Sequence, residues 1–329
     1  MERRTFVTAL GISLRTVPAR LAAQSPPRLP RVGYLFSFTP AAGRHLWEAY
    51  RRGLLELGYA EGRNVVLEPR WAEGHHERLA ALAADLVRLG VDVIVAAATP
   101  ASRAVKAATS AIPIVFVAVA EPVKAGLVAT LARPGGNATG LSLLTPELGA
   151  KRLQLLRDVQ RKLQRVAVLS NRETPSHAVF LQETRSAAQR MGIAVEPPLE
   201  ARNADEIDRV LRNASLGGAA AGLIVFDDPV IWSHRARIVG LAAERRLAVM
   251  YGYREFVDDG GLMSYGPDRV DLYRRTALYV DRILKGTRPA ELPVEQPTKF
   301  EMVVNVKTAR ALGLTIPAAL LLQAEQVVP

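Results

Sequence analysis

The chain has 329 residues, enough for two domains of ordinary size, and its 49% hydrophobic and 23% charged residues are typical of a globular protein. It contains no cysteine, which excludes disulfides, thiolate catalysis and cysteine-ligated zinc. The net charge of +11 raises nucleic acid as a partner, but the Lys and Arg are spread along the chain without a helix-turn-helix, zinc finger or aromatic RNA-binding motif, so we expect no nucleic-acid binding.

The first 30 residues resemble an export signal followed by a linker. Charged residues at Glu2–Arg4 precede an apolar run at Phe6–Leu14, and the small residues Ala22–Ala23 suit a cleavage site. Arg3–Val7 also resembles the twin-arginine export motif. We therefore predict export to the periplasm; the alternative is an N-terminus without regular structure. No later stretch has the roughly 18 uninterrupted apolar residues that a spanning helix needs.

Strand and helix patterns alternate through the first half of the chain, which is typical of βαβ units and a parallel sheet. The expected strands are 31–36, 64–70, 91–97, 112–119 and 137–143. The expected helices are 41–58, 76–89, 101–109 and one that begins after Glu121–Pro122.

The segment 91–102 is the most informative of these. Its apolar run has no alternation, which indicates a strand buried on both faces. Thr99 is a good N-cap for the next helix, and Pro100 suits the first helical position. The turn would then present backbone N–H groups at the carboxyl edge of the sheet, where open α/β sheets bind ligands. We expect it to bind an anion such as a carboxylate.

The second half repeats this scheme. Thr145 is expected to cap a helix that runs to 160, and helices are expected to end at 192 and to cover 204–214 and 230–245. The expected strands are 165–170, 193–196, 221–226 and 247–251. In the tail we expect strands at 261–266 and 298–305 and helices at 268–285 and 307–312, which return to complete both sheets.

The predicted fold is therefore α/β, with two Rossmann-like lobes, parallel sheets and a hinge that the chain crosses several times. Lobe 1 would comprise 31–144 and about 266–290, and lobe 2 would comprise 145–265 and about 291–329. A ligand cleft is expected between the carboxyl edges of the two sheets.

The search for catalytic motifs finds no metal-binding histidine pair, no Gly-x-Ser-x-Gly elbow and no phosphate loop. Asp227 and Asp228 are adjacent, so their side chains diverge and cannot readily face each other as a catalytic pair. One of them could receive an amino group, cap the next helix, or do both, and Glu121 has the same two interpretations. A zwitterion such as an amino acid would suit such a cleft. We expect no catalytic residue, no metal and no cofactor.

Several motifs, in this order, resemble those of ABC-transporter substrate-binding proteins related to tryptophan- and tyrosine-binding transport components. They include Leu54–Asn64, Pro69–Gly74, Arg133–Gly140, Gly260–Gly266, Ile283–Gly286 and Ala311–Pro317. The resemblance implies a type I periplasmic-binding-protein fold, capture of a small ligand by hinge closure, an ABC permease in the inner membrane as partner, a monomer, and no catalytic activity.

The resemblance also implies ligand contacts at turns that follow strands. Carried over to this sequence, the residues are Ser37, Phe38, Thr39, Thr99, Pro100, Ala101, Ser102, Glu121, Pro122, Asn171, Asp227 and Asp228, with Tyr251 as an addition. Phe38 and Tyr251 permit an aromatic ligand but do not require one. The alternative functions are a two-lobed α/β enzyme, such as a transferase, or an effector-sensing domain.

Overall fold

The structure is a computed structural model that describes residues 28–143, 146–174, 176–216 and 220–329. The predicted export signal within 1–27 and the predicted cap at Thr145 lie outside these ranges. Among the described residues, no helix is long and apolar enough to cross a membrane.

The first sheet has five parallel strands in the order β2-β1-β3-β4-β5. Its strands are β1 (Arg31–Phe36), β2 (Val66–Trp71), β3 (Val93–Ala97), β4 (Ile114–Val119) and β5 (Ala138–Ser142). The helices between them are α1 (Pro40–Glu56), the 3-10 helix η1 (His76–Arg78), α2 (Leu79–Arg88) and α3 (Ala98–Ala108). All of β3 is buried, as its unbroken apolar run predicted.

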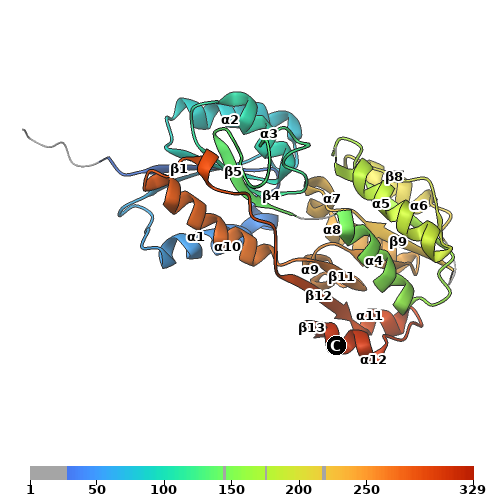
Figure 1. Cartoon of the computed structure of the whole chain (residues 1–329). Coiled ribbons are helices and arrows are strands. Elements are labelled where there is room, and N and C mark those ends of the chain that lie inside the picture. Colours follow the sequence, from blue (N-terminus) through green and yellow to red (C-terminus); the bar gives the residue numbers. More distant parts are fainter. Residues whose placement is uncertain (1–27, 144–145, 175, 217–219) are drawn as a thin grey trace, which may run out of the picture.

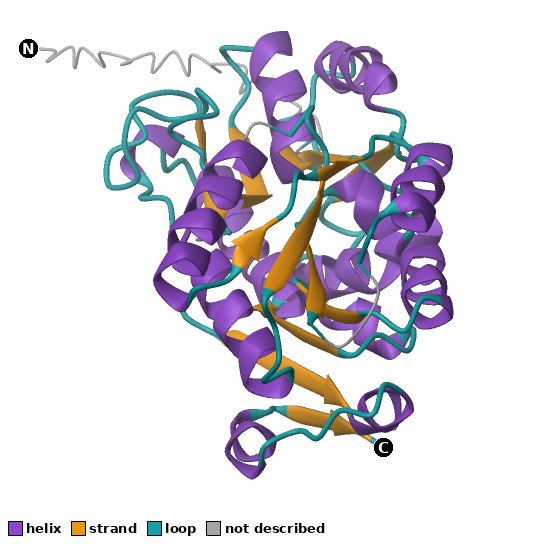
Figure 2. Ribbon diagram, turned by 90° about the vertical axis from the view of Figure 1, so that its right-hand side faces the viewer, coloured by secondary structure: helices purple, strands orange, loops and turns teal. Residues whose placement is uncertain are grey.

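The second sheet has eight strands in the order β13-β12-β11-β10-β9-β6-β7, with β8 also pairing with β6. Its strands are β6 (Arg165–Ser170), β7 (Ala194–Val195), β8 (Leu199–Glu200), β9 (Ala221–Val225), β10 (Ala248–Tyr251), β11 (Met263–Pro267), β12 (Phe300–Asn305) and β13 (Gln326–Val328). All pairs are parallel except β11–β12. Helices flank the strands on both sides (Figure 2).

Most helices of the second half belong to this sheet. They are α4 (Pro146–Val159), α5 (Ser176–Met191), α6 (Ala204–Asn213), α7 (Pro229–Ser233), α8 (Arg235–Glu244), α9 (Arg254–Asp258), α11 (Val306–Ala311) and α12 (Ala318–Gln323), and a 3-10 helix, η2 (Pro289–Glu291), lies against β5.

The helix α10 (Arg269–Leu284) follows a strand of the second sheet but packs on the first lobe. It lies beside α1 (Figure 1) and also contacts β3, β4 and β5. Gly53 permits this approach, because a Cβ there would lie 2.2 Å from the carbonyl oxygen of Arg274. The chain therefore crosses between the sheets at the start of α10, next to the ends of the strands.

Several local expectations were wrong. Thr99 is not the N-cap of α3: the cap is Ala97, and the chain turns at Ala98, whose φ is 71°, so Thr99 is already helical. No helix follows Glu121–Pro122, because a single turn closes at Gly126 with φ 73°.

The expected helix 230–245 is broken at His234, which separates α7 from α8. The tail strands β11, β12 and β13 all join the second sheet rather than completing both sheets. The short elements α9, α12 and β13 were not expected.

Candidate functional site

A pocket lies where the carboxyl ends of the two sheets face each other. It contains about 480 Å³ of empty space, part of it open to solvent. Its lining follows four strands of each sheet: Phe38, Ala98, Thr99, Pro100, Ala118, Ala120 and Leu143 from the first, and Thr174, Ser176, Asp227, Asp228, Pro229, Trp232, Tyr253, Arg269 and Tyr273 from the second and from α10.

The wall from the first sheet is made of small residues and strained backbone. Ala98 and Ala118 have φ values of 71° and 59°, a region that non-glycine residues rarely occupy. Ala118 coincides with a break in the β4–β5 register between Val117 and Val119. Such strain costs on the order of 1–3 kcal/mol per residue and concentrates at ligand sites. The strained backbone therefore turns two strand ends toward the pocket.

Asp228 is buried, with 2% of its surface exposed, and its carboxylate has four donors. Oδ1 caps α7 by accepting from the N–H groups of Val230 (2.8 Å) and Ile231 (3.1 Å). Oδ2 accepts from the Thr174 hydroxyl (2.5 Å) and the Asn171 side-chain amide (3.3 Å). These four donors use about all the lone-pair positions of a carboxylate. Asp228 thus joins the turn after β6 to the turn after β9.

Asp227 points elsewhere, as expected for an adjacent residue. Its Oδ2 accepts from Nη2 of Arg152 at 2.8 Å, and Arg152 also donates from Nε to the Tyr265 carbonyl. No described residue donates a hydrogen bond to Oδ1 of Asp227. The side chain keeps 10% of its surface exposed. Of the two carboxylates, Asp227 therefore has the free acceptor.

His177, at the start of α5, holds the same two turns together. Its Nδ1 accepts from the Asn171 N–H at 2.9 Å, and its Nε2 donates to the Asp227 carbonyl oxygen at 3.1 Å. This pattern requires the neutral ring with the proton on Nε2. Burial lowers the pKa of His177, although Asp228 and the bond to Asp227 act in the opposite direction. Sequence reasoning did not assign this role to His177.

Arg269 is the buried cation of the pocket. Its guanidinium carbon lies 4.3 Å from the ring centroids of both Trp232 and Tyr253, a cation–π arrangement. Its Nη1 pairs with Oε1 of Glu255 at 3.2 Å.

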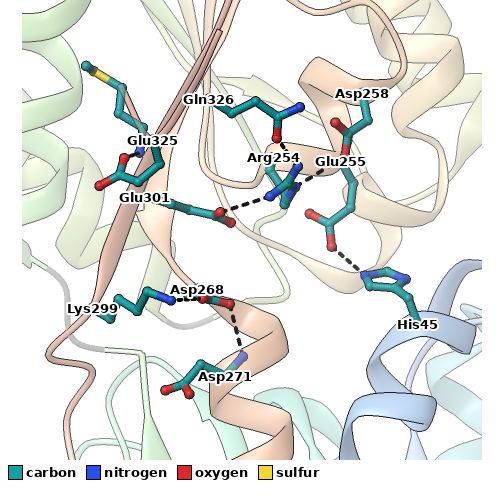
Figure 3. A network of polar contacts seen from close by, with 11 residues as sticks. His45, Arg254, Glu255, Asp258, Asp268, Asp271, Lys299, Glu301, Glu325 and Gln326 are labelled. Carbon is teal, nitrogen blue, oxygen red and sulfur yellow. Dashed lines mark hydrogen bonds and ion pairs between the residues drawn. The ribbon is translucent and has the colours of Figure 1, made fainter. Parts of the chain in front are cut away.

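Glu255, on α9 of the second lobe, contacts both Arg269 of α10 and α1 of the first lobe. Its Oε1 also lies 2.9 Å from Nε2 of His45, so that α9 of the second lobe contacts α1 of the first (Figure 3). Burial raises the pKa of Glu255, but Arg269 and His45 outweigh it and lower the pKa to about 2. The carboxylate is therefore ionised at neutral pH.

The sequence-predicted residues fall into three groups. Those that line the pocket are Phe38, Thr99, Pro100, Asp227 and Asp228. Those that lie behind its wall are Ser37, Thr39, Ala101, Ser102 and Asn171. Ser37 donates to the Ala97 carbonyl, Ser102 donates to the Ala98 carbonyl, and Thr39 caps α1.

The third group does not line the pocket. Glu121 pairs with Lys124 at 3.6 Å, Pro122 lies in the same turn, and Tyr251 stacks on Phe256. The ligand contacts of all these residues stay predictions.

Sequence reasoning missed four large lining side chains, Trp232, Tyr253, Arg269 and Tyr273. Each follows the carboxyl end of a strand in the second sheet, so the rule that found Asp227 could have found them. Among the described residues, no group of three or more His, Cys, Asp or Glu is arranged to hold a metal ion.

Comparisons with known proteins relate most of the chain to one family. Residues 45–328 match the family described as ABC transporter substrate binding protein. The chain is 26% identical over 269 residues to the tyrosine-binding protein of Clostridioides difficile (strain R20291), covering 81% of this chain and 76% of that protein.

Two solved structures are similar over the whole fold. The crystal structure of an ABC domain in complex with L-Trp from Streptococcus pneumonia has a TM-score of 0.84 and 26% identity, covering 91% of this chain and 100% of that one. The ligand-free, open structure of a substrate binding protein with adhesive properties from Clostridium difficile has a TM-score of 0.68 and 25% identity, covering 91% of this chain and 99% of that one.

Proposed function

This chain belongs to the family of ABC transporter substrate-binding proteins, and from that premise we propose that it captures an amino-acid-like solute between its two lobes and delivers it to an ABC permease. The family that the sequence motifs indicated is confirmed, and so is the predicted α/β fold of type I periplasmic binding proteins. The ligand, its contacts and the partner are the proposed parts.

The observation that carries this proposal is the pairing of opposite polarities across one pocket. On the first-lobe wall, Ala98 and Thr99 form the first turn of an 11-residue helix, whose free N–H groups and dipole favour a carboxylate. On the second-lobe wall, Oδ1 of Asp227 accepts no hydrogen bond from a described residue. An α-amino acid would place its carboxylate on α3 and its ammonium on Asp227.

The remaining lining supports a ligand with an apolar or aromatic body. Phe38 and Trp232 approach from opposite lobes with ring centroids 4.9 Å apart, and Tyr253 lies on the other side of Arg269. Relatives described as binding L-Trp and tyrosine support the same class of ligand. We therefore propose an amino acid with a sizeable side chain.

Hinge closure is proposed as the mechanism of capture. The chain is more similar to the L-Trp complex (TM-score 0.84) than to the ligand-free, open structure (0.68), although the sequence identities are almost equal. A ligand that contacts both lobes only when they are closed stabilises the closed state.

For the lobes we propose 31–143 with about 266–296, and 146–265 with about 297–329. The bridge between Leu141 and Glu295 supports placing the end of the returning segment with lobe 1. We also propose that the protein acts in the periplasm as a monomer, without catalysis. The family supports this proposal, because its members bind solutes for transport.

A thermal-shift screen of amino acids and small carboxylates tests the proposal, since a ligand that prefers the folded state raises its melting temperature. We expect at least one amino acid to do so. Calorimetry should then show that Asp227→Asn weakens its binding about tenfold or more, because a charge-assisted contact is lost.

Asp205→Asn, at an exposed carboxylate on α6, is the control and should bind normally. If no amino acid or carboxylate shifts the melting temperature, the proposed ligand class is wrong. Consumption of a bound compound would instead favour the enzyme alternative.

A further inference from the structure

Three buried donor atoms in residues of the pocket lining have no well-formed hydrogen bond to a described residue, although the side chains of Arg269 and Tyr273 interact with each other. They are Nε1 of Trp232, Nε of Arg269 and the hydroxyl of Tyr273. The three residues expose 1%, 6% and 0% of their surfaces. Buried donors are costly to leave unpaired, so a site that contains three of them is built for acceptors.

The three side chains that carry these donors lie close together. Arg269 and Tyr273 are on the first two turns of α10, and Trp232 comes from α7. The guanidinium of Arg269 stacks on the Trp232 ring, and its carbon lies 5.9 Å from the Tyr273 ring centroid. Aromatic rings thus surround the guanidinium, whose N–H groups still need hydrogen-bond acceptors.

Arg269 supplies the positive charge at this place, and Glu255 is its carboxylate partner. Glu255 pairs with Arg269, but its Oε1 is shared with His45 of the other lobe. Indole and guanidinium nitrogens donate only, so neither can accept a hydrogen bond from a ligand. The complementary group is therefore an oxygen acceptor.

We propose that Trp232, Arg269 and Tyr273 form a subsite for an oxygen acceptor at the end of the ligand side chain. The protein then prefers amino acids whose side chains end in a carboxylate or a hydroxyl oxygen to apolar side chains of the same length. The inference rests on the proposed function, which assigns the α-carboxylate to α3 and the α-ammonium to Asp227. A ligand whose side chain carries only a donor, such as L-tryptophan, leaves these three donors unpaired and binds more weakly.

Calorimetry with matched ligands tests this preference. The first pair is L-glutamate and L-norleucine, whose side chain ends in an apolar group in place of the carboxylate. The second pair is L-tyrosine and L-phenylalanine, which lacks the neutral hydroxyl. We expect at least about tenfold tighter binding of the oxygen-bearing member in at least one pair, because an apolar partner leaves buried donors unpaired. The two pairs distinguish an anionic from a neutral acceptor.

Conservative variants assign the preference to these residues. Trp232→Phe and Tyr273→Phe each remove one donor and keep an aromatic ring, so both variants should fold. Each should reduce the ratio of the affinity for the oxygen-bearing ligand to that for its apolar partner at least about threefold. Tyr50→Phe is the control, because the Tyr50 hydroxyl is also buried without a partner but does not line the pocket. It should leave the ratio unchanged.

A third pair without an ammonium group, 3-(4-hydroxyphenyl)propanoate and 3-phenylpropanoate, separates this inference from the proposed function. If amino acids bind with no preference for the acceptor, or if Tyr50→Phe changes the ratio as much as Tyr273→Phe, the subsite is refuted and the proposed function stands. If only the hydroxylated propanoate binds, the subsite stands and the amino-acid ligand is wrong. If no compound binds, both are wrong.

Discussion

At the scale of single residues, Asp228 shows how a site residue can be mainly structural. Two of its four donors come from the turn after β6 and two from the start of α7, so all four belong to the protein. The sequence pattern of Asp before Pro allowed both the cap and the ligand contact. The geometry gives the cap to Asp228 and leaves the free oxygen on Asp227.

We therefore expect Asp228→Ala to destabilise the protein by about 2 kcal/mol, because it removes a helix cap and leaves buried donors unpaired. Urea denaturation at neutral pH measures this change. Asp205→Ala, at an exposed position, should stay within about 0.5 kcal/mol of the parent. A fully stable Asp228→Ala variant would show that the carboxylate does not hold the two turns.

His177 makes the free energy of unfolding decrease as the pH falls. Because burial lowers its pKa in the folded protein, the unfolded chain binds a proton more readily near the ordinary value of about 6.5. The stabilising contribution of His177 is therefore complete above that pH and is lost as the pH falls through and below it.

In His177→Gln, the decrease in unfolding free energy between pH 7.5 and 5.5 should be smaller than in the parent. Denaturation curves at several pH values measure it. The decrease should not vanish, because burial also lowers the pKa of His234. His75→Gln, at an exposed histidine, should keep the slope of the parent; equal slopes in all three proteins would contradict the assignment to His177.

At the scale of elements, the pairing of β4 with β5 depends on one glycine. Gly140 has φ 150°, and a Cβ there would lie 1.9 Å from the carbonyl oxygen of Phe116 in the neighbouring strand. This contact is with backbone, so no side chain can move away to relieve it.

Gly140→Ala should destabilise the protein by about 3 kcal/mol or more, or prevent folding, because it forces the strands apart behind Ala118 and the pocket wall. Gly240→Ala is the control: Gly240 is in α8 with open space around it, and the change should stabilise the protein by about 0.5–1 kcal/mol. Thermal or urea denaturation compares the two. Equal effects would mean that the strands can separate without cost.

Most strands and helices were predictable because their signals are local. The buried run at β3, the glycine that ends α1 and the apolar spacing of α10 each predict an element within a few residues. The errors arise where tertiary contacts decide. The left-handed turn at Ala98 has no glycine to mark it, and Gly126 ended a turn that resembled the start of a helix.

At the scale of the whole molecule, the sequence assigned about 266–290 to lobe 1 but did not identify the element on which α10 packs. Alternating strands and helices predicted two lobes and a site at their carboxyl edges. Nothing local to 268–285 shows that this helix leaves the second sheet and packs on α1. Arg269 and Tyr273 were missed because ligand contacts were predicted in the turns after strands, whereas these two residues lie on the helix that follows the turn, and the crossing brings that helix to the pocket.

Several contacts join the lobes near the pocket, including those that Arg269 of α10 makes with Trp232, Tyr253 and Glu255. Two others come from Phe38, which lies against Trp232, and from His45 of α1, which lies 2.9 Å from Glu255 of α9. The contact of Phe38 belongs to the pocket lining. The contact of His45 with Glu255 is outside the lining, but it reaches the lining in two ways: the His45 ring centroid lies 6.2 Å from that of Trp232, and Glu255 pairs with Arg269.

His45→Ala should therefore shift the free protein toward open lobes and weaken ligand binding about two- to fivefold. The side chains of His45 and Glu255 are 41% and 12% exposed, so their contact stabilises the closed state by at most about 1 kcal/mol. In His45→Ala the ligand must supply that amount to close the lobes. Small-angle scattering of the free protein should give a larger radius of gyration in His45→Ala, and saturating ligand should restore the parent value. His75→Ala removes a pair of similar length, His75–Glu77 at 3.0 Å, within the first lobe, and should change neither quantity. If His45→Ala weakens binding without expanding the free protein, the contact acts on the pocket through Glu255 and Arg269 and not on closure.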